Sequence, residues 1–175
     1  ANEKSLAHST VFAKYIQSNL QSLKVDLSNT IRQTDNGSEY IGAWNAKEPS
    51  AYTKTVESIE GQIHQTIPVR KYRYQADVET VHDIIEREFY EIESFASRQD
   101  FMDKAWTYQL FFNLERPNTY KEGKTPWQLA RGKLPDIKKD VAMIPAVDLD
   151  ALLYGNTKFP FDFIQNGVYD VSSSP

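Results

Sequence analysis

Hydrophobic residues recur at helical spacing in four stretches of the chain. Over residues 5–24 they are three or four positions apart, so they share one face of a helix. Similar stretches run from Tyr52 to Ile63, over residues 77–95 and over residues 99–114. The pattern predicts four amphipathic helices. The first stripe consists of Leu6, Val11 or Phe12, Tyr15, Ile16, Leu20 and Leu23.

The third and fourth predicted helices carry different side chains. The expected core stripe of the third is Val78, Val81, Ile85, Phe89 and Ile92. Its acidic and histidine side chains fall on another face, because they are three and four residues apart; they are Glu79, His82 and Glu86. The fourth helix is rich in aromatic residues, which predicts a core or subunit contact. It should end before Pro117, since proline disfavours helix in the residue that precedes it.

Two short stretches rich in β-branched residues, 29–34 and 66–74, predict strands. Asp35-Asn36-Gly37 should end the first strand in a turn. After a loop over residues 42–49 comes the second helix, and after the fourth helix a short one over residues 127–131. Thr125 should cap that helix, with Pro126 at its first position. Beyond Leu134 the chain is expected to be irregular.

The order helix, strand, helix, strand, helix, helix predicts an α/β layered fold. Two strands are too few to form a stable sheet alone. We therefore expect that further strands exist, either unrecognised in this sequence or contributed from outside it.

Composition changes this picture little. The 175 residues include no cysteine, which excludes disulfides and thiolate metal sites and fits a reducing compartment. No apolar stretch approaches the length of a membrane span, and no leader resembles a signal peptide. We therefore expect a cytoplasmic protein that does not associate with membranes.

Charge is unevenly distributed. The net charge of −4 weighs against a general nucleic-acid binder. Residues 116–139 nevertheless contain seven Lys and Arg residues against two acidic ones. Residues 70–73 contain three more basic side chains. Either cluster is a solvated surface or a place where phosphates bind.

Two carboxylates are the candidate chemical groups. Asp35 follows a predicted strand, and Glu79 lies near the start of a predicted helix. Carboxylates on separate rigid elements can together hold divalent metal ions against phosphate. Taken singly, each has an ordinary interpretation, because an Asp-Asn-Gly is commonly a plain turn and a helical glutamate is commonly solvated. His82, taken alone, is a surface or half-buried histidine.

Three motifs occur in the order in which a known family has them. The first is Thr34–Tyr40, TDNGSEY. The second joins Val78–His82, VETVH, to a following EFY. The third joins Asn113–Asn118, NLERPN, to a following GKTP. Over residues 9–134 the chain thereby resembles the catalytic core of the DDE transposases and retroviral-type integrases, especially bacterial insertion-sequence transposases.

The resemblance implies an RNase H-like (integrase core) fold and metal-dependent cleavage and strand transfer of DNA. Asp35 and Glu79 would be catalytic residues and ligands of Mg²⁺ or Mn²⁺. Gly37 would shape the turn through a positive φ. The side chains expected to contact DNA are His82, Arg87, Arg116, Lys121 and Lys124. For Arg116 the alternative is a cap or an ion pair with a carboxylate.

Several features depart from the family pattern. The family site has three carboxylates, and its first aspartate lies on a strand well before the second. The residues before Asp35 resemble the helix that follows the family's third strand. We therefore expect residues 1–134 to be the C-terminal part of a core, inactive alone, and residues 135–175 to be an extension. Asp83 and Glu86 on the glutamate helix would repel phosphates.

Three functions are compatible with this sequence. The first is part of a recombinase, and the second is a non-catalytic DNA-docking or oligomerisation module with the same ancestry. The third is a structure-specific nuclease on the same fold. Exposed strand edges and apolar helix faces would favour a homo-oligomer. The apolar run Phe159–Phe163 should dock on the core or on a neighbouring chain.

Overall fold

The computed structural model describes residues 4–43, 45–68 and 76–155. Helices dominate, and two short strands form one parallel sheet. The α/β class is thereby confirmed. Two compact units make up the chain. Unit 1 comprises Ala1–Ser22, Asp26–Gln65 and Asp148–Pro175, and unit 2 comprises Leu23–Val25 and Thr66–Val147. The chain thus leaves unit 1 and returns to it, at borders other than the boundary expected at residue 134.

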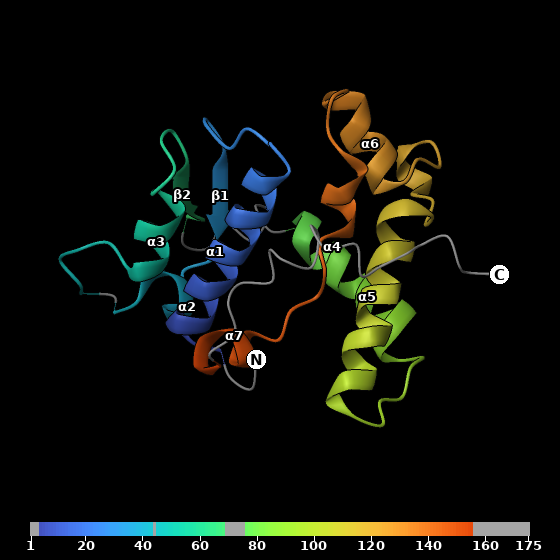
Figure 1. Cartoon of the computed structure of the whole chain (residues 1–175), viewed down its shortest axis with the longest axis horizontal. Coiled ribbons are helices and arrows are strands. Elements are labelled where there is room, and N and C mark those ends of the chain that lie inside the picture. Colours follow the sequence, from blue (N-terminus) through green and yellow to red (C-terminus); the bar gives the residue numbers. More distant parts are fainter. Residues whose placement is uncertain (1–3, 44, 69–75, 156–175) are drawn as a thin grey trace. The chain divides into compact units, whose positions relative to one another are not determined.

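Unit 1 contains the sheet. Its elements are α1 (Leu6–Ser22), β1 (Ile31–Thr34), α2 (Ser38–Ile41), α3 (Ala51–Val56), β2 (Ile63–Thr66) and α7 (Leu149–Tyr154) (Figure 1). The predicted first helix and first strand are confirmed. The short helix α2 was not predicted, because four residues are too few for a helical period to be recognised.

The second predicted helix is too long. It ends at Val56, and Ile63 opens β2 rather than closing the helix. Gly61, which has φ +79°, lies in the turn between them and would bring a Cβ within 3.0 Å of the Asn29 backbone nitrogen. The predicted strand over 66–74 thus begins earlier, at Ile63. Residues 69–75 of that prediction lie outside the described residues, together with the basic side chains among them.

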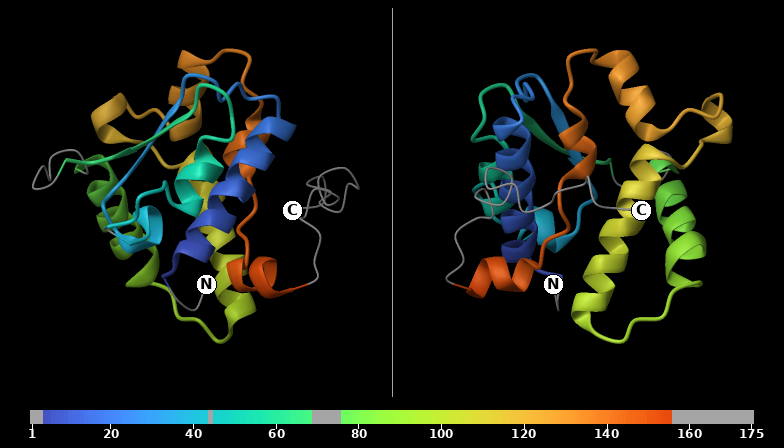
Figure 2. Two further views of the ribbon diagram at one scale, coloured as in Figure 1. Left: turned by 90° about the vertical axis from the view of Figure 1, so that its left-hand side faces the viewer. Right: turned by 45° about the vertical axis from the view of Figure 1, so that its right-hand side comes forward.

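Helix α1 packs against α3 to form the core of unit 1 (Figure 2). The buried side chains at the centre are Ala13, Tyr52 and Val56, and Leu6 and Tyr40 pack around them. Helix α7 lies beside α1. There the buried His8 imidazole, 3% exposed, joins the two helices through a 2.8 Å contact between its Nε2 and Asp150 Oδ1.

Unit 2 is helical. Its elements are α4 (Ala76–Ile85), the π-helical turn η2 (Glu86–Tyr90), α5 (Arg98–Leu114), the 3₁₀ turn η3 (Thr119–Lys121), α6 (Pro126–Lys133) and the 3₁₀ turn η4 (Lys139–Met143). Helices α5 and α6 confirm their predictions. Thr125 caps α6 in a capping box with Gln128, and Pro126 occupies the first turn, as expected.

The predicted core stripe of the third helix is wrong for most of its length. Val78 is 53% exposed and Ile92 is 72% exposed, whereas Phe89 is 3% exposed. The helix changes to π geometry at Glu86, where the Glu91 N–H donates to the Glu86 carbonyl over 2.9 Å. A wider turn accounts for Ile92, which follows it and is rotated away from the stripe that a uniform period of 3.6 residues predicts. Val78 precedes this turn, and its exposure has no explanation in the contacts of α4.

The segment after Leu134 is more regular than expected. It forms η4 and α7, and its backbone is held on α5 by two side chains. Gln109 Nε2 donates to the Ile144 carbonyl over 2.7 Å, and Asn113 Nδ2 donates to the Ala142 carbonyl over 2.9 Å. These distant partners give no periodic signal in the local sequence. The run over residues 159–163 lies outside the described part of the chain.

Within the described ranges, no helix combines the length and the apolar character needed to cross a lipid bilayer.

Candidate functional site

Asp35 stands directly after β1, at the carboxyl end of the strand. This is the end of a parallel pair at which α/β proteins position ligands. Asp35 is half-buried, and its Oδ1 accepts the Gly37 backbone N–H over 2.9 Å. The carboxylate is thereby fixed on the turn that follows the strand. The sequence prediction that Asp35 ends a strand is confirmed.

Gly37 leaves space here for two carboxylates, and its backbone has no special torsion. Its φ is −63°, so the expected positive φ is wrong. A Cβ at this position would lie 2.4 Å from Glu39 Oε2 and 2.9 Å from Asp35 Oδ1. Such separations are far below van der Waals contact. The two carboxylates therefore converge over the bare α-carbon of Gly37.

Glu39 is the second acid of this cluster and was not predicted. It is 9% exposed, and its Oε1 accepts from Lys4 Nζ over 2.8 Å. The Lys4 ammonium holds the pKa of Glu39 below its usual value, chiefly through that hydrogen bond. The pKa of Lys4 is raised in turn, first by Glu39 and to a smaller extent by Asp35. An acid and a base are thus paired beside Asp35.

His64 of β2 supports the same strand end. Its Nε2 lies 2.9 Å from Thr34 Oγ1, and its Nδ1 lies 2.8 Å from Thr53 Oγ1. Because the Thr34 hydroxyl donates to the Asp35 carbonyl, it accepts from His64, which assigns the proton of the neutral ring to Nε2. Burial lowers the pKa of His64, and the charge of Arg32 adds to this, against an opposing effect of Glu57.

The lowered pKa of His64 predicts a loss of stability in mild acid. The unfolded chain binds the proton more readily than the folded one, so the contribution is complete above the ordinary value of 6.5. It is lost as pH falls through the lower folded-state pKa. Urea unfolding between pH 7.5 and 5 should show a decline, and His64→Gln should flatten it. His82→Gln, at an exposed position on α4, is the control and should keep the slope.

The predicted site residues of the glutamate helix are on the surface. Glu79, His82 and Arg87 are all exposed, and Arg87 Nε donates to the Asp83 carbonyl over 3.1 Å. Asp35 belongs to unit 1 and Glu79 to unit 2. Their meeting at a common ion therefore stays a prediction.

Arg116 forms an ion pair with a carboxylate, which was the alternative to its predicted contact with DNA. Its Nε and Nη2 each donate to one oxygen of Glu88 over 2.6 Å, and Tyr108 adds a hydroxyl at 3.2 Å. Hydrogen bonding from Arg116 lowers the pKa of Glu88. The Arg116 guanidinium also lies over the Phe112 ring, with its central carbon 5.5 Å from the ring centroid. This bidentate ion pair connects η2 to the residues that follow α5.

The other two predicted DNA contacts lie on one tight loop. Lys121 and Lys124 are exposed, and the Lys124 N–H donates to the Lys121 carbonyl over 2.9 Å. Lys124 Nζ also lies 2.6 Å from Glu122 Oε2. Glu122 and Gly123 have φ of 58° and 72°, which makes the turn tight enough to bring the two lysines together. Their contact with DNA stays a prediction.

No cluster of three or more His, Cys, Asp or Glu side chains suited to a metal ion occurs among the described residues. The side chains around the end of β1 that the sequence did not reveal are Lys4, Arg32, Glu39 and His64. They come from three elements and the residues before them, so no local motif links them. Of these residues, only Glu39 had a signal in the sequence, because it lies in the same TDNGSEY motif as Asp35.

No protein-family model, curated protein or solved structure matches the chain.

Proposed function

We propose that this chain is the C-terminal part of a DNA recombinase core of the transposase and integrase type, with an RNase H-like fold. Its reaction class is metal-dependent transfer of DNA phosphodiesters. Asp35 and Glu79 supply two of the carboxylate ligands, and a further aspartate, absent from the described cluster, completes the site. The chain alone binds DNA and metal but does not catalyse strand transfer.

The position of Asp35 is the observation that carries this proposal. It is a half-buried carboxylate fixed at the carboxyl end of a parallel strand. The neighbouring strand β2 precedes α4, on which Glu79 is exposed and open to a ligand. The family motifs place one acid at the end of a strand and a second acid on the helix after the next strand. Asp35 and Glu79 have these positions in the chain.

The third motif has a structural role that supports the same ancestry. Glu88 of the EFY motif and Arg116 of the NLERPN motif bind each other through two 2.6 Å hydrogen bonds. Phe89 of the former is the buried centre of the unit 2 aromatic cluster. Motifs far apart in sequence are thereby joined in one unit.

The donor chemistry fits a hard divalent cation. Carboxylate oxygens suit Mg²⁺ or Mn²⁺, and the Asp35 oxygen that Gly37 binds is oriented by the backbone. Asp35 and Glu79 would hold such ions, whose chemistry would be to activate the attacking oxygen and stabilise the departing 3′-oxygen. The protein itself holds Asp35 at its strand end, keeps Glu39 ionised through Lys4, and presents Glu79 on a helix.

Calorimetric titration with Mn²⁺ tests this function. Asp35→Asn and Glu79→Gln should each weaken Mn²⁺ binding about tenfold or more, because loss of a direct ligand costs at least as much as loss of an outer-shell partner. Glu91→Gln, at an exposed position of unit 2, is the matched control and should bind as the unaltered chain does. Far-UV circular dichroism should show that all three variants are folded.

Two results would contradict the proposal. Equal Mn²⁺ affinity in the unaltered chain and both variants would remove the shared metal site. A loss in only one variant would show that Asp35 and Glu79 do not act on the same ion, and the chain would then be a non-catalytic module.

A further inference from the structure

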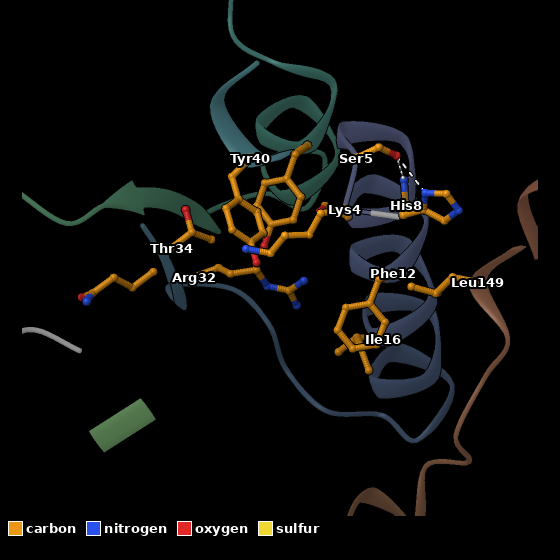
Figure 3. A pocket seen from close by; sticks show the side chains of 12 residues that line it. Lys4, Ser5, His8, Phe12, Ile16, Arg32, Thr34, Tyr40 and Leu149 are labelled. Carbon is orange, nitrogen blue, oxygen red and sulfur yellow. Dashed lines mark hydrogen bonds between the residues drawn. The ribbon is translucent and has the colours of Figure 1, made fainter. Parts of the chain in front are cut away.

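A hollow of about 430 Å³ opens in unit 1 beside the strand end that carries Asp35. This volume is within the range of ligand sites. Its walls come from α1, β1, α2 and α3, with one side chain from α7 (Figure 3). The members used below are Lys4, Phe12, Ile16, Arg32, Tyr40 and Tyr52.

One wall of the hollow is apolar and accessible. Phe12 is 47% exposed although it lies on the helix face that turns towards the sheet, and Ile16 lies one turn further along. On the other side, the rings of Tyr40 and Tyr52 meet edge to face with centroids 5.1 Å apart. A flat ring of a ligand would cover the Phe12 face, since aromatic pairs gain from contact beyond simple burial.

The hollow also contains the guanidinium of Arg32, which could bind an anion. Arg32 extends from β1 towards α1, from which Phe12 and Ile16 project (Figure 3). Within the described part of the chain, Arg32 makes no ion pair, and the Tyr52 hydroxyl lies beside its guanidinium. Lys4, by contrast, is neutralised by Glu39. A half-buried guanidinium in an apolar setting gains most from a phosphate or carboxylate that it can bind through two hydrogen bonds.

The hollow lies next to the proposed catalytic residue Asp35. Thr34 lines the hollow and is directly followed by Asp35. Tyr40, which directly follows Glu39, lines the hollow as well, so both acids adjoin its wall. Burial raises the pKa of Tyr40, and the charges of Asp35 and Glu39 add to this. A ligand in the hollow would therefore lie next to the phosphodiester that Asp35 is proposed to act on.

We propose that this hollow binds one unpaired nucleotide, with its base on Phe12 and Ile16 and its phosphate on Arg32. The choice of a nucleotide rests on the proposed function, whose substrate is DNA. A base within a duplex is stacked on both faces and cannot cover Phe12, so the site selects a single strand or an extruded nucleotide. The same chemistry would also admit a free nucleoside monophosphate.

Fluorescence anisotropy with a short labelled oligothymidylate, in EDTA and at low salt, tests the site in the full chain. Phe12→Ala and Arg32→Gln should each raise the dissociation constant roughly tenfold, from lost stacking and a lost charge-assisted contact. The matched controls are Ile31→Ala, which removes an apolar side chain that is 61% exposed and outside the hollow, and Lys54→Gln, which removes an exposed cation of α3. Both should stay within about twofold of the unaltered chain.

Competition identifies the source of the nucleotide. Displacement by thymidine monophosphate would assign the site to a free nucleotide as well as to a strand, and failure to displace would assign it to the strand. Unchanged affinity in Phe12→Ala and Arg32→Gln, or equally good competition by duplex DNA, would overturn the inference. Because EDTA removes metal, Asp35→Asn should keep nucleotide binding, and this separates failure of the hollow from failure of the metal site.

Discussion

Replacing Phe89 by alanine is expected to lower the free energy of unfolding of unit 2 by about 3–5 kcal/mol, the usual cost of removing a buried phenyl ring. Phe89 is 3% exposed. Its ring is stacked on Tyr108 with centroids 5.1 Å apart, and it meets Phe95 at 5.4 Å and Phe101 at 6.2 Å. Truncation would leave a cavity that these large rings cannot fill without moving together.

Hydrogen exchange measured by mass spectrometry would locate this effect, because it reports each segment separately. Amides of η2 and α5 should exchange faster in Phe89→Ala. Tyr120→Ala is the control, since Tyr120 is 94% exposed and its loss should change stability by less than about 0.5 kcal/mol. If both variants exchanged alike, Phe89 would not be the centre of the unit 2 core.

Replacing Gln17 by alanine is expected to destabilise unit 1 by about 2–4 kcal/mol. Gln17 is 4% exposed, and its Nε2 amide donates to three acceptors, two of them in fully buried hydrogen bonds. These are the carbonyls of Thr55 and Val56, at 3.1 and 3.0 Å, and Gln62 Oε1, at 2.6 Å. The Thr55 carbonyl keeps the Ser58 N–H and hydroxyl as donors, but alanine leaves the Val56 carbonyl and Gln62 Oε1 without this donor. Each unsatisfied buried group costs about 1–3 kcal/mol.

The Gln17 contacts matter for the site because they join α1 to the end of α3 and to the residue before β2. Urea unfolding of Gln17→Ala should show a lower midpoint with an unchanged slope. Gln21→Ala removes the same side chain from an exposed position of α1 and should leave the midpoint nearly unchanged. Equal midpoints for the two variants would show that the buried amide contributes nothing to unit 1.

The sequence predicted elements with strong local signals and failed where distant contacts decide. Helix α1 has a long stripe of hydrophobic residues, α5 ends before a proline, and α6 begins with a capping box, so each was recognisable. The strand β2 reads Ile-His-Gln-Thr, and its isoleucine continued the spacing of the preceding helix. The π-helical turn at Glu86 breaks the period on which the stripe of the third helix was predicted.

The candidate site was predictable only in part. The turn residues after β1 gave Asp35 a position at a strand end, which the structure has. The side chains around that strand end could not be foreseen, because Lys4, which binds Glu39, and His64, which binds Thr34, come from separate parts of the sequence. The role of Gly37 was misjudged for the same reason, since crowding by a side chain is invisible in a turn motif. Arg116 was a proposed DNA contact, and its pairing with Glu88 follows from the fold of unit 2.

The return of the chain to unit 1 has a consequence for biosynthesis. Helix α7, whose Asp150 meets the buried His8 ring, is separated from α1 by the whole of unit 2. A ribosome releases α7 after every residue of unit 2, so unit 2 can fold while the His8 imidazole still lacks its Asp150 partner. Unit 1 is therefore expected to mature last during translation, and a nascent chain stalled before residue 148 would expose His8 to water.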